Sequence, residues 1–356
     1  MLTIFSPDHQ FQDGNAELVR GHLVKPYERP QRAELIIKQV RQSALGQVEE
    51  PQDYGIAPIA KVHDPAFIDF LEQAWARWSD LGRTHDALPL CWPVRNLGQA
   101  PGQPPLQAPN RLPESIDGQL SYFSFDAGTP IIEGTWRAIT ASVNTAIEGA
   151  ERLIKGEKAV FSLCRPPGHH AHRDFYGGYC FFNNAAIAAQ YLLDRGCARV
   201  SILDVDYHHG NGTQALFYER GDVQFLSLHG DPKTEFPFFL GYGEETGHGP
   251  GLGHNHNFPM PAGTGWAAWL ASLTQALERI ADYAPDALIV SLGVDTYKDD
   301  PISAFTLDHD DYPELGALIA GVGRPTLFVM AGGYAIDAIG VNTVNVLSGF
   351  DSANAI

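Results

Sequence analysis

The sequence predicts an α/β fold: one open, three-layer domain in which helices cover both faces of a mostly parallel β-sheet. Apolar runs of strand length alternate along the chain with longer stretches of helical periodicity, which is typical of such a sheet. The run from Val200 to Leu203 is the clearest of them and predicts a strand buried on both faces. One large sheet can hold the chain's 356 residues, so we expect a single domain over 1–356.

The expected strands are short apolar runs bounded by turn residues. The N-terminus predicts a first strand followed by a turn. Because a helical stretch lies between most later strands, these strands are expected to lie parallel in one sheet. They fall at 159–163, 200–205, 223–228, 287–292 and 326–330.

The expected helices have apolar residues at three- and four-residue spacing. The stretch 32–44 shows this spacing clearly. In the stretch 65–79, Asp64 can cap the first turn and Pro65 fits the first helical position. Further helices are expected at 136–155, 184–195, 266–283, 312–321 and 339–347.

Residues 82–133 interrupt this regular pattern. Proline is frequent there and few periodic runs occur, and a loop of this length in a compact domain is usually functional. Because it also contains aromatic residues, among them Trp92 and Phe125, we expect an ordered insertion. It would pack on the body, on a second subunit or over the site.

Composition excludes some classes of partner. The formal net charge of −18 repels nucleic-acid phosphates and is compatible with a cationic substrate. No run approaches the roughly 20 apolar residues that span a bilayer, and the N-terminus lacks a signal-peptide core. We therefore expect a cytoplasmic protein that binds neither nucleic acid nor membrane. The four cysteines show no disulfide pattern.

Polar clusters follow five of the expected strands. In open parallel sheets, ligands bind beyond the carboxyl ends of the strands, where these clusters would meet. Each cluster alone could be an ordinary turn, but five consecutive strands with such ends predict an active site. The polar residues at these ends are His169, His170, Asp206, His208, His229, Asp231, Asp295 and Tyr334.

Asp206, His208 and Asp295 offer oxygen, nitrogen and oxygen ligands for a metal ion. Residues two apart in an extended chain point to the same side, so Asp206 and His208 can reach one point. Three protein ligands leave open positions for water and substrate, as a catalytic metal site requires. We therefore predict a divalent metal centre on these three side chains.

The adjacent His169 and His170 offer a general base and a general acid or electrostatic partner. Asp204 could hold the tautomer of one ring and Asn211 that of the other, which would separate their pKa values. Tyr334, which follows two glycines, can hydrogen-bond an oxyanion. A metal, a water, a base and an oxyanion donor together predict hydrolysis of an amide or related carbonyl group.

The motifs around these residues resemble those of the metal-dependent deacetylases of the arginase–deacetylase superfamily. The match runs over most of the chain. Within this superfamily, the sequence is most similar to bacterial acetylpolyamine amidohydrolases. The segment Ile-Phe-Ser-Pro-Asp-His at 4–9 and the long insertion support this closer similarity. The motifs are Arg-Pro-Pro-Gly-His-His at 165–170, Gly-Gly-Tyr-Cys at 177–180, Leu-Asp-Val-Asp-Tyr-His-His-Gly-Asn-Gly-Thr-Gln at 203–214, Ser-Leu-Gly-Val-Asp at 291–295 and Gly-Gly-Tyr at 332–334.

The resemblance implies the arginase–deacetylase fold and a zinc ion, or ferrous iron in some settings, on the three predicted ligands. It also implies that the histidine pair is catalytic and that Tyr334 donates to the transition state. A structural potassium ion is implied near Asp204, Ser227 and Leu228, held largely by backbone carbonyls.

The same resemblance implies that Tyr179 and Phe236 form the walls of a narrow tunnel. It also implies that Glu17 is an acidic residue that contributes to selectivity for polyamines. One acidic position expected in the inserted loop is a glycine here, and Asp117 and Asp126 are candidate substitutes. The insertion implies a homodimer whose subunits jointly narrow the active-site entrance.

We therefore expect a zinc-dependent deacetylase of N-acetylated polyamines, such as acetylputrescine and acetylcadaverine. A deacetylase of acetyl-lysine in peptides or proteins stays open as the alternative. A non-catalytic ligand-binding protein and an arginase-like two-metal hydrolase fit less well, because the catalytic set is complete and one metal set is visible. The histidine-rich stretch 248–256 could bind adventitious metal.

Overall fold

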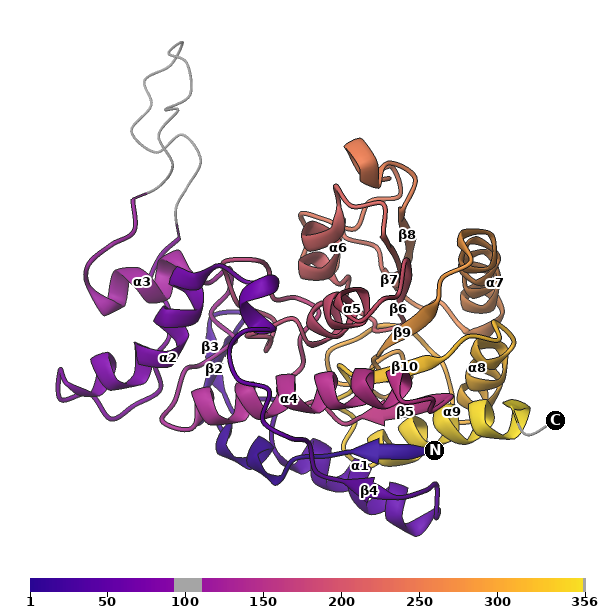
Figure 1. Cartoon of the computed structure of the whole chain (residues 1–356). Coiled ribbons are helices and arrows are strands. Elements are labelled where there is room, and N and C mark those ends of the chain that lie inside the picture. The colour runs from indigo at the N-terminus through magenta and orange to yellow at the C-terminus, as the bar shows by residue number, and fades with distance from the viewer. Residues whose placement is uncertain (93–110, 355–356) are drawn as a thin grey trace.

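An eight-stranded parallel sheet forms the centre of the computed structural model, which describes residues 1–92 and 111–354 (Figure 1). All seven pairs of neighbouring strands in this sheet are parallel. Across the sheet, the strands are β4 (Val48–Glu49), β1 (Leu2–Ile4), β5 (Ala159–Ser162), β10 (Thr326–Met330), β9 (Ala287–Leu292), β6 (Val200–Asp204), β7 (Val223–Gly230) and β8 (Asn255–Met260).

Helices cover both faces of the sheet and enclose two separate hydrophobic cores. One core lies under α2 (Pro65–Ser79), α4 (Thr135–Ile154) and α5 (Asn184–Asp194). The other lies under α1 (Gln31–Gln42), α7 (Trp266–Tyr283), α8 (Asp311–Ala320) and α9 (Ile339–Asn354). Figure 1 shows α7, α8 and α9 together at the side of the sheet away from α2.

Successive residues of the strands supply opposite cores, because side chains alternate between the two faces of a sheet. Val160 packs in the first core and Phe161, the next residue of β5, packs in the second. On β6, Ile202 and Leu203 divide in the same way. Burial on both faces explains why these strands are apolar runs rather than alternating ones.

The predicted α/β class and the parallel sheet are confirmed. The expected strands and long helices occur within a few residues of their predicted bounds. The largest difference is α9, which continues to Asn354 instead of ending near residue 347.

Smaller elements were not expected from the sequence. Strand β8 extends the sheet beyond β7, although its Asn-His-Asn-Phe-Pro-Met sequence lacks the β-branched residues that indicate strands. The antiparallel pair β2 (Glu17–Val19) and β3 (His22–Val24), and the helix α6 (Asn211–Phe217), are too short for periodicity to show. The short 3₁₀ helices are η1 (Pro7–Phe11), η2 (Ile59–Lys61) and η3 (Gly249–Gly251).

The insertion predicted at 82–133 contains a helix, α3 (Ile116–Tyr122), which packs beside α2. Its prolines at 93, 101, 104, 105 and 109 lie outside the described residues. Phe123 and Phe125, which follow α3, pack against aromatic rings of the body. The described part of the insertion therefore packs on the body of the protein.

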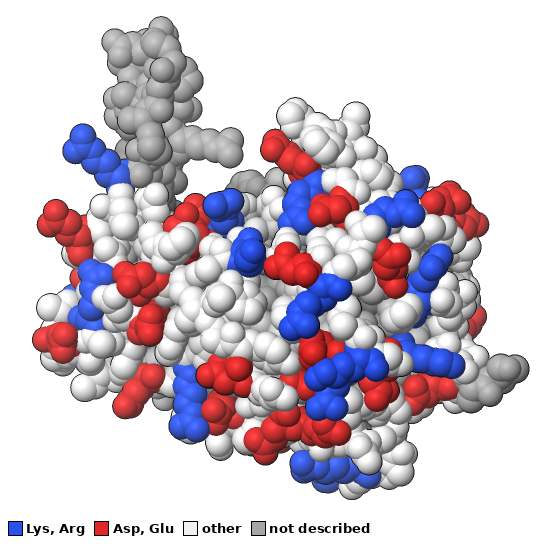
Figure 2. All heavy atoms as spheres, in the orientation of Figure 1, with Lys and Arg blue, Asp and Glu red and all other residues white. Residues whose placement is uncertain are grey.

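Charged side chains of both signs share the surface. On the face that Figure 2 shows, blue basic and red acidic residues of the described chain lie among one another. The net charge of −18 thus acts on cations as a long-range field rather than through one patch on this face. In the described part of the chain, every helix is too short or too polar to cross a bilayer.

Candidate metal centre and active site

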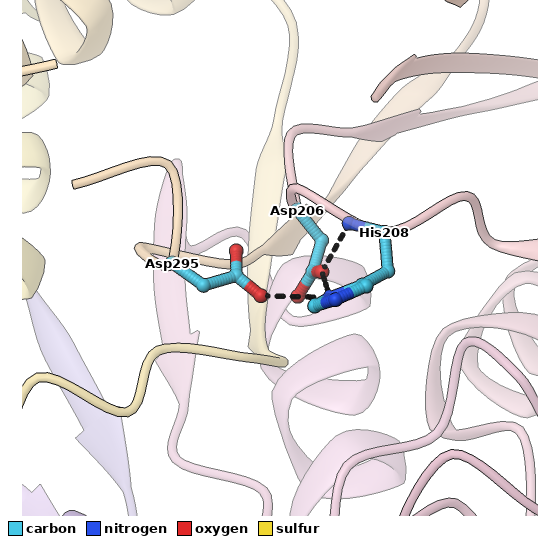
Figure 3. A group of neighbouring side chains, drawn as sticks. All are labelled: Asp206, His208 and Asp295. Atoms are coloured by element: carbon cyan, nitrogen blue, oxygen red, sulfur yellow. Dashed lines mark hydrogen bonds and ion pairs between the residues drawn. The ribbon is translucent and has the colours of Figure 1, made fainter. Parts of the chain in front are cut away.

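Two neighbouring strands, β6 and β9, end at the same edge of the sheet and deliver the predicted metal ligands. Asp206 and His208 follow β6, and Asp295 follows β9, whose Ser291 pairs with Asp204 of β6. Figure 3 shows the three side chains pointing toward one another. The parallel register therefore brings together residues that are 87 positions apart in sequence.

The three ligand atoms lie within 4.8 Å of one another, and all three residues are buried. His208 Nδ1 is 3.2 Å from Asp295 Oδ2 and 3.4 Å from Asp206 Oδ1. The other oxygen of each carboxylate accepts a backbone hydrogen bond: Gly332 N–H donates to Asp206, and Tyr207 N–H donates to Asp295. The remaining oxygens and Nδ1 are thereby fixed in place facing one another.

The electrostatics of this group fit a divalent cation. Burial and the negative charge of Asp206 raise the pKa of Asp295 to about 7. Two buried carboxylates at this separation repel each other unless positive charge lies between them. Two oxygens and one imidazole nitrogen form a ligand set that suits zinc and similar metals, with coordination positions left for other ligands.

His169 and His170 lie beside the metal ligands with different partners. His169 Nδ1 is 3.0 Å from the carboxylate Oδ2 of Asp204, and His170 Nδ1 is 2.6 Å from the amide Oδ1 of Asn211. The two ring centres are 4.0 Å apart. His169 Nε2 is 3.9 Å from Asp206 Oδ1, so this ring faces the metal ligands.

The different partners give the two histidines different pKa values. Burial lowers the pKa of His169, but the charges of Asp204 and Asp206 outweigh burial and raise it to about 9. Burial and the adjacent positive charge of His169 hold the pKa of His170 well below its usual value. At neutral pH the pair is therefore one imidazolium and one neutral imidazole, which suits acid–base chemistry.

Tyr334 lies on the loop after β10, next to the metal ligands. The N–H of Gly332 on this loop donates to Asp206 Oδ2 at 2.7 Å. Burial raises the pKa of the Tyr334 phenol well above its usual value, so the hydroxyl keeps its proton and can donate it in a hydrogen bond. The guanidinium of Arg32 lies 4.7 Å from the centre of the Tyr334 ring.

Aromatic rings surround the histidines. The ring of Phe236 is 5.1 Å from that of His170, and Phe125 of the insertion stacks on Phe236 at 5.7 Å. Tyr179 packs 5.6 Å from Tyr334. The structure thus places Phe236 beside His170 and Tyr179 beside Tyr334, and their role as tunnel walls stays a prediction.

Glu17 is a buried carboxylate near Tyr179. Its Oε1 accepts a long 3.4 Å hydrogen bond from Tyr27 N–H, and Oε2 has no hydrogen-bond partner among the described residues. Burial raises the pKa of Glu17 to about 7, against the opposing effect of the neighbouring Tyr179 phenol. A buried acceptor of this kind is costly unless a donor or a cation completes it.

The structure does not bring every predicted residue to the site. Asp117 on α3 forms an ion pair with Arg83, at 2.7 Å, and no described contact joins it to the metal ligands. Its predicted role in substrate binding stays a prediction. Asp126 lies closer, because it accepts a hydrogen bond from Gly178 N–H beside Tyr179.

The residues predicted for a monovalent cation lie side by side. Asp204 of β6 pairs with Ser227 of β7, and Leu228 is the next residue of that strand. Among the described residues, the histidine-rich stretch at 248–256 supplies no metal-ligating group, and His256 belongs to strand β8. His248 instead pairs with Glu219 at the surface.

Buried groups that the sequence did not single out support the site. Glu28 accepts hydrogen bonds from the guanidinium groups of Arg32 and Arg165, and all three are buried. Arg165 is the first residue of the Arg-Pro-Pro-Gly-His-His motif, which is the one sequence signal for it. Arg32 gave no signal, because a polar residue in the first turn of a helix is ordinary.

Known proteins resemble the chain over nearly its whole length. It is 54% identical to acetylpolyamine amidohydrolase 2 of Pseudomonas aeruginosa, covering 99% of this chain and 100% of that protein. It is 49% identical to the acetylpolyamine amidohydrolase of Mycoplana ramosa, with 98% and 99% covered.

Solved structures agree with this relationship. A crystal structure of an acetylpolyamine aminohydrolase from Burkholderia pseudomallei matches with a TM-score of 0.91 at 40% identity, covering 99% of each chain. The histone deacetylase domain model matches residues 26–350. The chain therefore belongs to the histone deacetylase domain family.

Proposed function

We propose that the protein is a zinc-dependent amidohydrolase that cleaves the acetyl amide of N-acetylated polyamines to acetate and the free amine. The metal-ligand group is the observation that indicates metal-dependent hydrolysis. Asp206, His208 and Asp295 place three buried ligand atoms within 4.8 Å of one another beside two histidines. Relatives at 54% and 49% identity, named for acetylpolyamines, support the substrate class.

A divalent ion, zinc or ferrous iron, would be held by Asp206, His208 and Asp295; when bound, it polarises the acetyl carbonyl and makes water more acidic. His170 is the general base. Its Nδ1–H donates to Asn211, which leaves Nε2 free to accept the proton of the attacking water. The same nitrogen returns that proton to the departing amine nitrogen as the C–N bond breaks.

Tyr334 and His169 stabilise the negative charge that develops on the carbonyl oxygen and its surroundings. Tyr334 donates a hydrogen bond because its phenol stays protonated at any ordinary pH. His169 contributes a positive charge that the Asp204 carboxylate maintains through their 3.0 Å contact. Neither group changes its protonation state in this scheme.

The substrate's aliphatic chain would lie between Tyr179 and Phe236, and its ammonium group would approach Glu17. The aromatic walls favour a slender apolar chain. Glu17 is the described acceptor best placed to gain from a cation, because it is buried, its Oε1 accepts a long backbone hydrogen bond, and a cation would join the Tyr179 phenol beside it. The net charge of −18 adds long-range attraction for a polycation.

We further propose a potassium ion beside Asp204, Ser227 and Leu228, and a homodimer in which the insertion at 82–133 helps to shape the entrance. The strand pairing of Asp204 with Ser227 supports the first proposal. The packing of Phe125 on Phe236 supports the second, since it carries the insertion to the site. A cytoplasmic location stays a prediction.

A substrate panel on zinc-loaded protein tests the proposal. Acetylputrescine and acetylcadaverine should be hydrolysed with a higher kcat/KM than an acetyl-lysine peptide. The variant Asp206→Ala, which removes a metal ligand, is the matched negative control. A clear preference for the peptide would contradict the polyamine assignment, and inactivity toward every acetylated amine would contradict the reaction itself.

A further inference from the structure

The acidic residue Asp300 contacts the loop that carries Tyr334. Its Oδ2 accepts hydrogen bonds from the backbone N–H groups of Tyr334, at 2.7 Å, and Ala335, at 3.1 Å. Its Oδ1 accepts from Ile302 N–H at 3.1 Å. Asp300 is 7% exposed, so three backbone donors satisfy a buried carboxylate.

Backbone pairing with the end of β9 and two charged side chains hold the start of this loop. Ala331 N–H donates to Leu292 O at 2.9 Å, and Val294 N–H donates to Gly332 O at 3.2 Å. Arg32 donates from Nη2 to Ala331 O and from Nε to Gly333 O, each at 2.6 Å. The N–H of Gly332 donates to the metal ligand Asp206. Gly333 has a φ of +120°, a conformation that glycine tolerates and that does not by itself set the direction of the next residue.

Beyond Gly333, the direction of the chain, and with it that of the Tyr334 side chain, depends on the partner of the Tyr334 N–H. Arg32 and Asp206 fix the backbone up to Gly333. From Tyr334 onward, the two N–H groups of residues 334 and 335 both turn to Asp300. Charge-assisted hydrogen bonds are roughly twice as strong as neutral ones, so charged groups hold the Gly333–Tyr334 peptide at both of its polar atoms: Arg32 at the carbonyl oxygen of Gly333 and Asp300 at the N–H of Tyr334.

We propose that Asp300 is a positioning residue for the oxyanion donor Tyr334, an inference that rests on the proposed function of Tyr334. Asp300 lies five residues after the ligand Asp295, in a turn closed by the Asp300 N–H to Tyr297 O bond at 3.0 Å. One segment therefore supplies a metal ligand and also aims the hydrogen-bond donor. The relative position of the ligand Asp295 and the donor Tyr334 is set through this shared segment.

Steady-state kinetics of Asp300→Ala on zinc-loaded protein test the proposal. A phenol misplaced by about 1 Å loses on the order of 10- to 100-fold in rate, so kcat should fall by that factor while KM and bound zinc stay near the parent values. Asp299→Ala is the matched control, because Asp299 is the exposed neighbour in the same turn. It should keep the parent kcat.

The double variant with Tyr334→Phe separates positioning from general damage. If Asp300 acts through the phenol, Asp300→Ala should cost almost nothing further once the hydroxyl is absent. Additive losses, a parent-like kcat in Asp300→Ala, or a loss of bound zinc would each overturn the proposal. Where the alanine variant folds poorly, Asp300→Asn, which keeps the side-chain volume, is put through the same cycle.

The activity of Tyr334→Phe alone separates the proposed role of Tyr334 from the proposed role of Asp300. If Tyr334→Phe retains parent activity, the proposed function of Tyr334 is wrong and Asp300 has no donor to position. If Tyr334→Phe is strongly impaired while Asp300→Ala is not, the proposed function stands and the positioning role of Asp300 is wrong.

Discussion

The Nδ1 atom of His170 lies 2.6 Å from the Oδ1 atom of Asn211, so an uncharged oxygen holds this ring. The equivalent atom of His169 faces the carboxylate of Asp204. Two adjacent histidines of the same motif are thus given opposite electrostatic surroundings.

Asn211→Asp should raise the pKa of His170, because an anion would replace the neutral acceptor. A nearby opposite charge typically shifts a pKa by about one unit or more. Since His170 must be neutral to accept a proton, the acidic limb of the kcat/KM profile should move to higher pH. The profile is measured with acetylputrescine, and Asn211→Ser serves as the uncharged control. An unchanged acidic limb would contradict the assignment of His170 as the base.

Tyr334→Phe should lower kcat by on the order of 100- to 1,000-fold, the usual cost of removing one oxyanion donor. The ring remains, so its packing against Tyr179 is kept. Zinc content, measured by elemental analysis, should stay at the parent level. Unchanged turnover would show that the hydroxyl does not contact the transition state.

Removal of metal with a chelator should abolish activity and lower the melting temperature. Without a cation, the buried carboxylates of Asp206 and Asp295 repel each other, and the stabilisation from ligand binding to the folded state is lost. Zinc should restore both properties. A chelated sample of Asp206→Ala should show no further change, and an equally stable, active chelated parent would argue against the metal centre.

Glu17→Gln should raise KM for acetylputrescine roughly tenfold, the equivalent of about 1.4 kcal/mol of charge interaction. Glu17 in the parent ionises near pH 7, so KM should fall as the pH rises through 7, and the variant should lack this change. The charged neighbours that bear on this titration are Asp126 and Glu28, with the Tyr179 phenol opposing burial. A neutral acetamide of the same length is the control substrate, and equal losses with both would contradict the role of Glu17.

The same titration affects stability with a defined sign. The pKa of Glu17 is higher in the folded protein than its ordinary value of 4.5, so the folded state binds the proton more tightly. The stability that this proton confers is fully present below about pH 4.5 and is lost as the pH rises from there to about 7. Denaturant titrations at pH values below and above this window should therefore show a smaller loss for Glu17→Gln than for the parent.

Gly316→Ala should destabilise the packing of α8 on α9. An added Cβ at this position would lie 1.9 Å from the carbonyl oxygen of Val346, which belongs to the backbone of α9 and cannot rotate away. Overpacking of this kind costs about 1–3 kcal/mol of unfolding free energy. Gly243→Ala adds the same methyl where the nearest atom is 4.0 Å away, and it should leave the denaturation midpoint unchanged.

Elements with a strong local pattern were predictable from the sequence. Strands such as β6 and β9 are apolar runs because both faces are buried, and α7 shows the predicted bounds of Trp266–Tyr283. Elements with weak patterns were missed. Strand β8 is held by its pairing with β7 rather than by its own composition.

By itself, the sequence determined which candidate site residues follow strand ends, because strand periodicity and residue type are local properties. It placed Asp206 beside His208 and joined both to Asp295 through the expected parallel sheet. Only the tertiary structure decided that Asp300 and Arg32 hold the Tyr334 loop and that Asp117 pairs with Arg83. The physical reason is that strand order and helix packing choose the partners of a buried charge, and neither leaves a periodic trace in the chain.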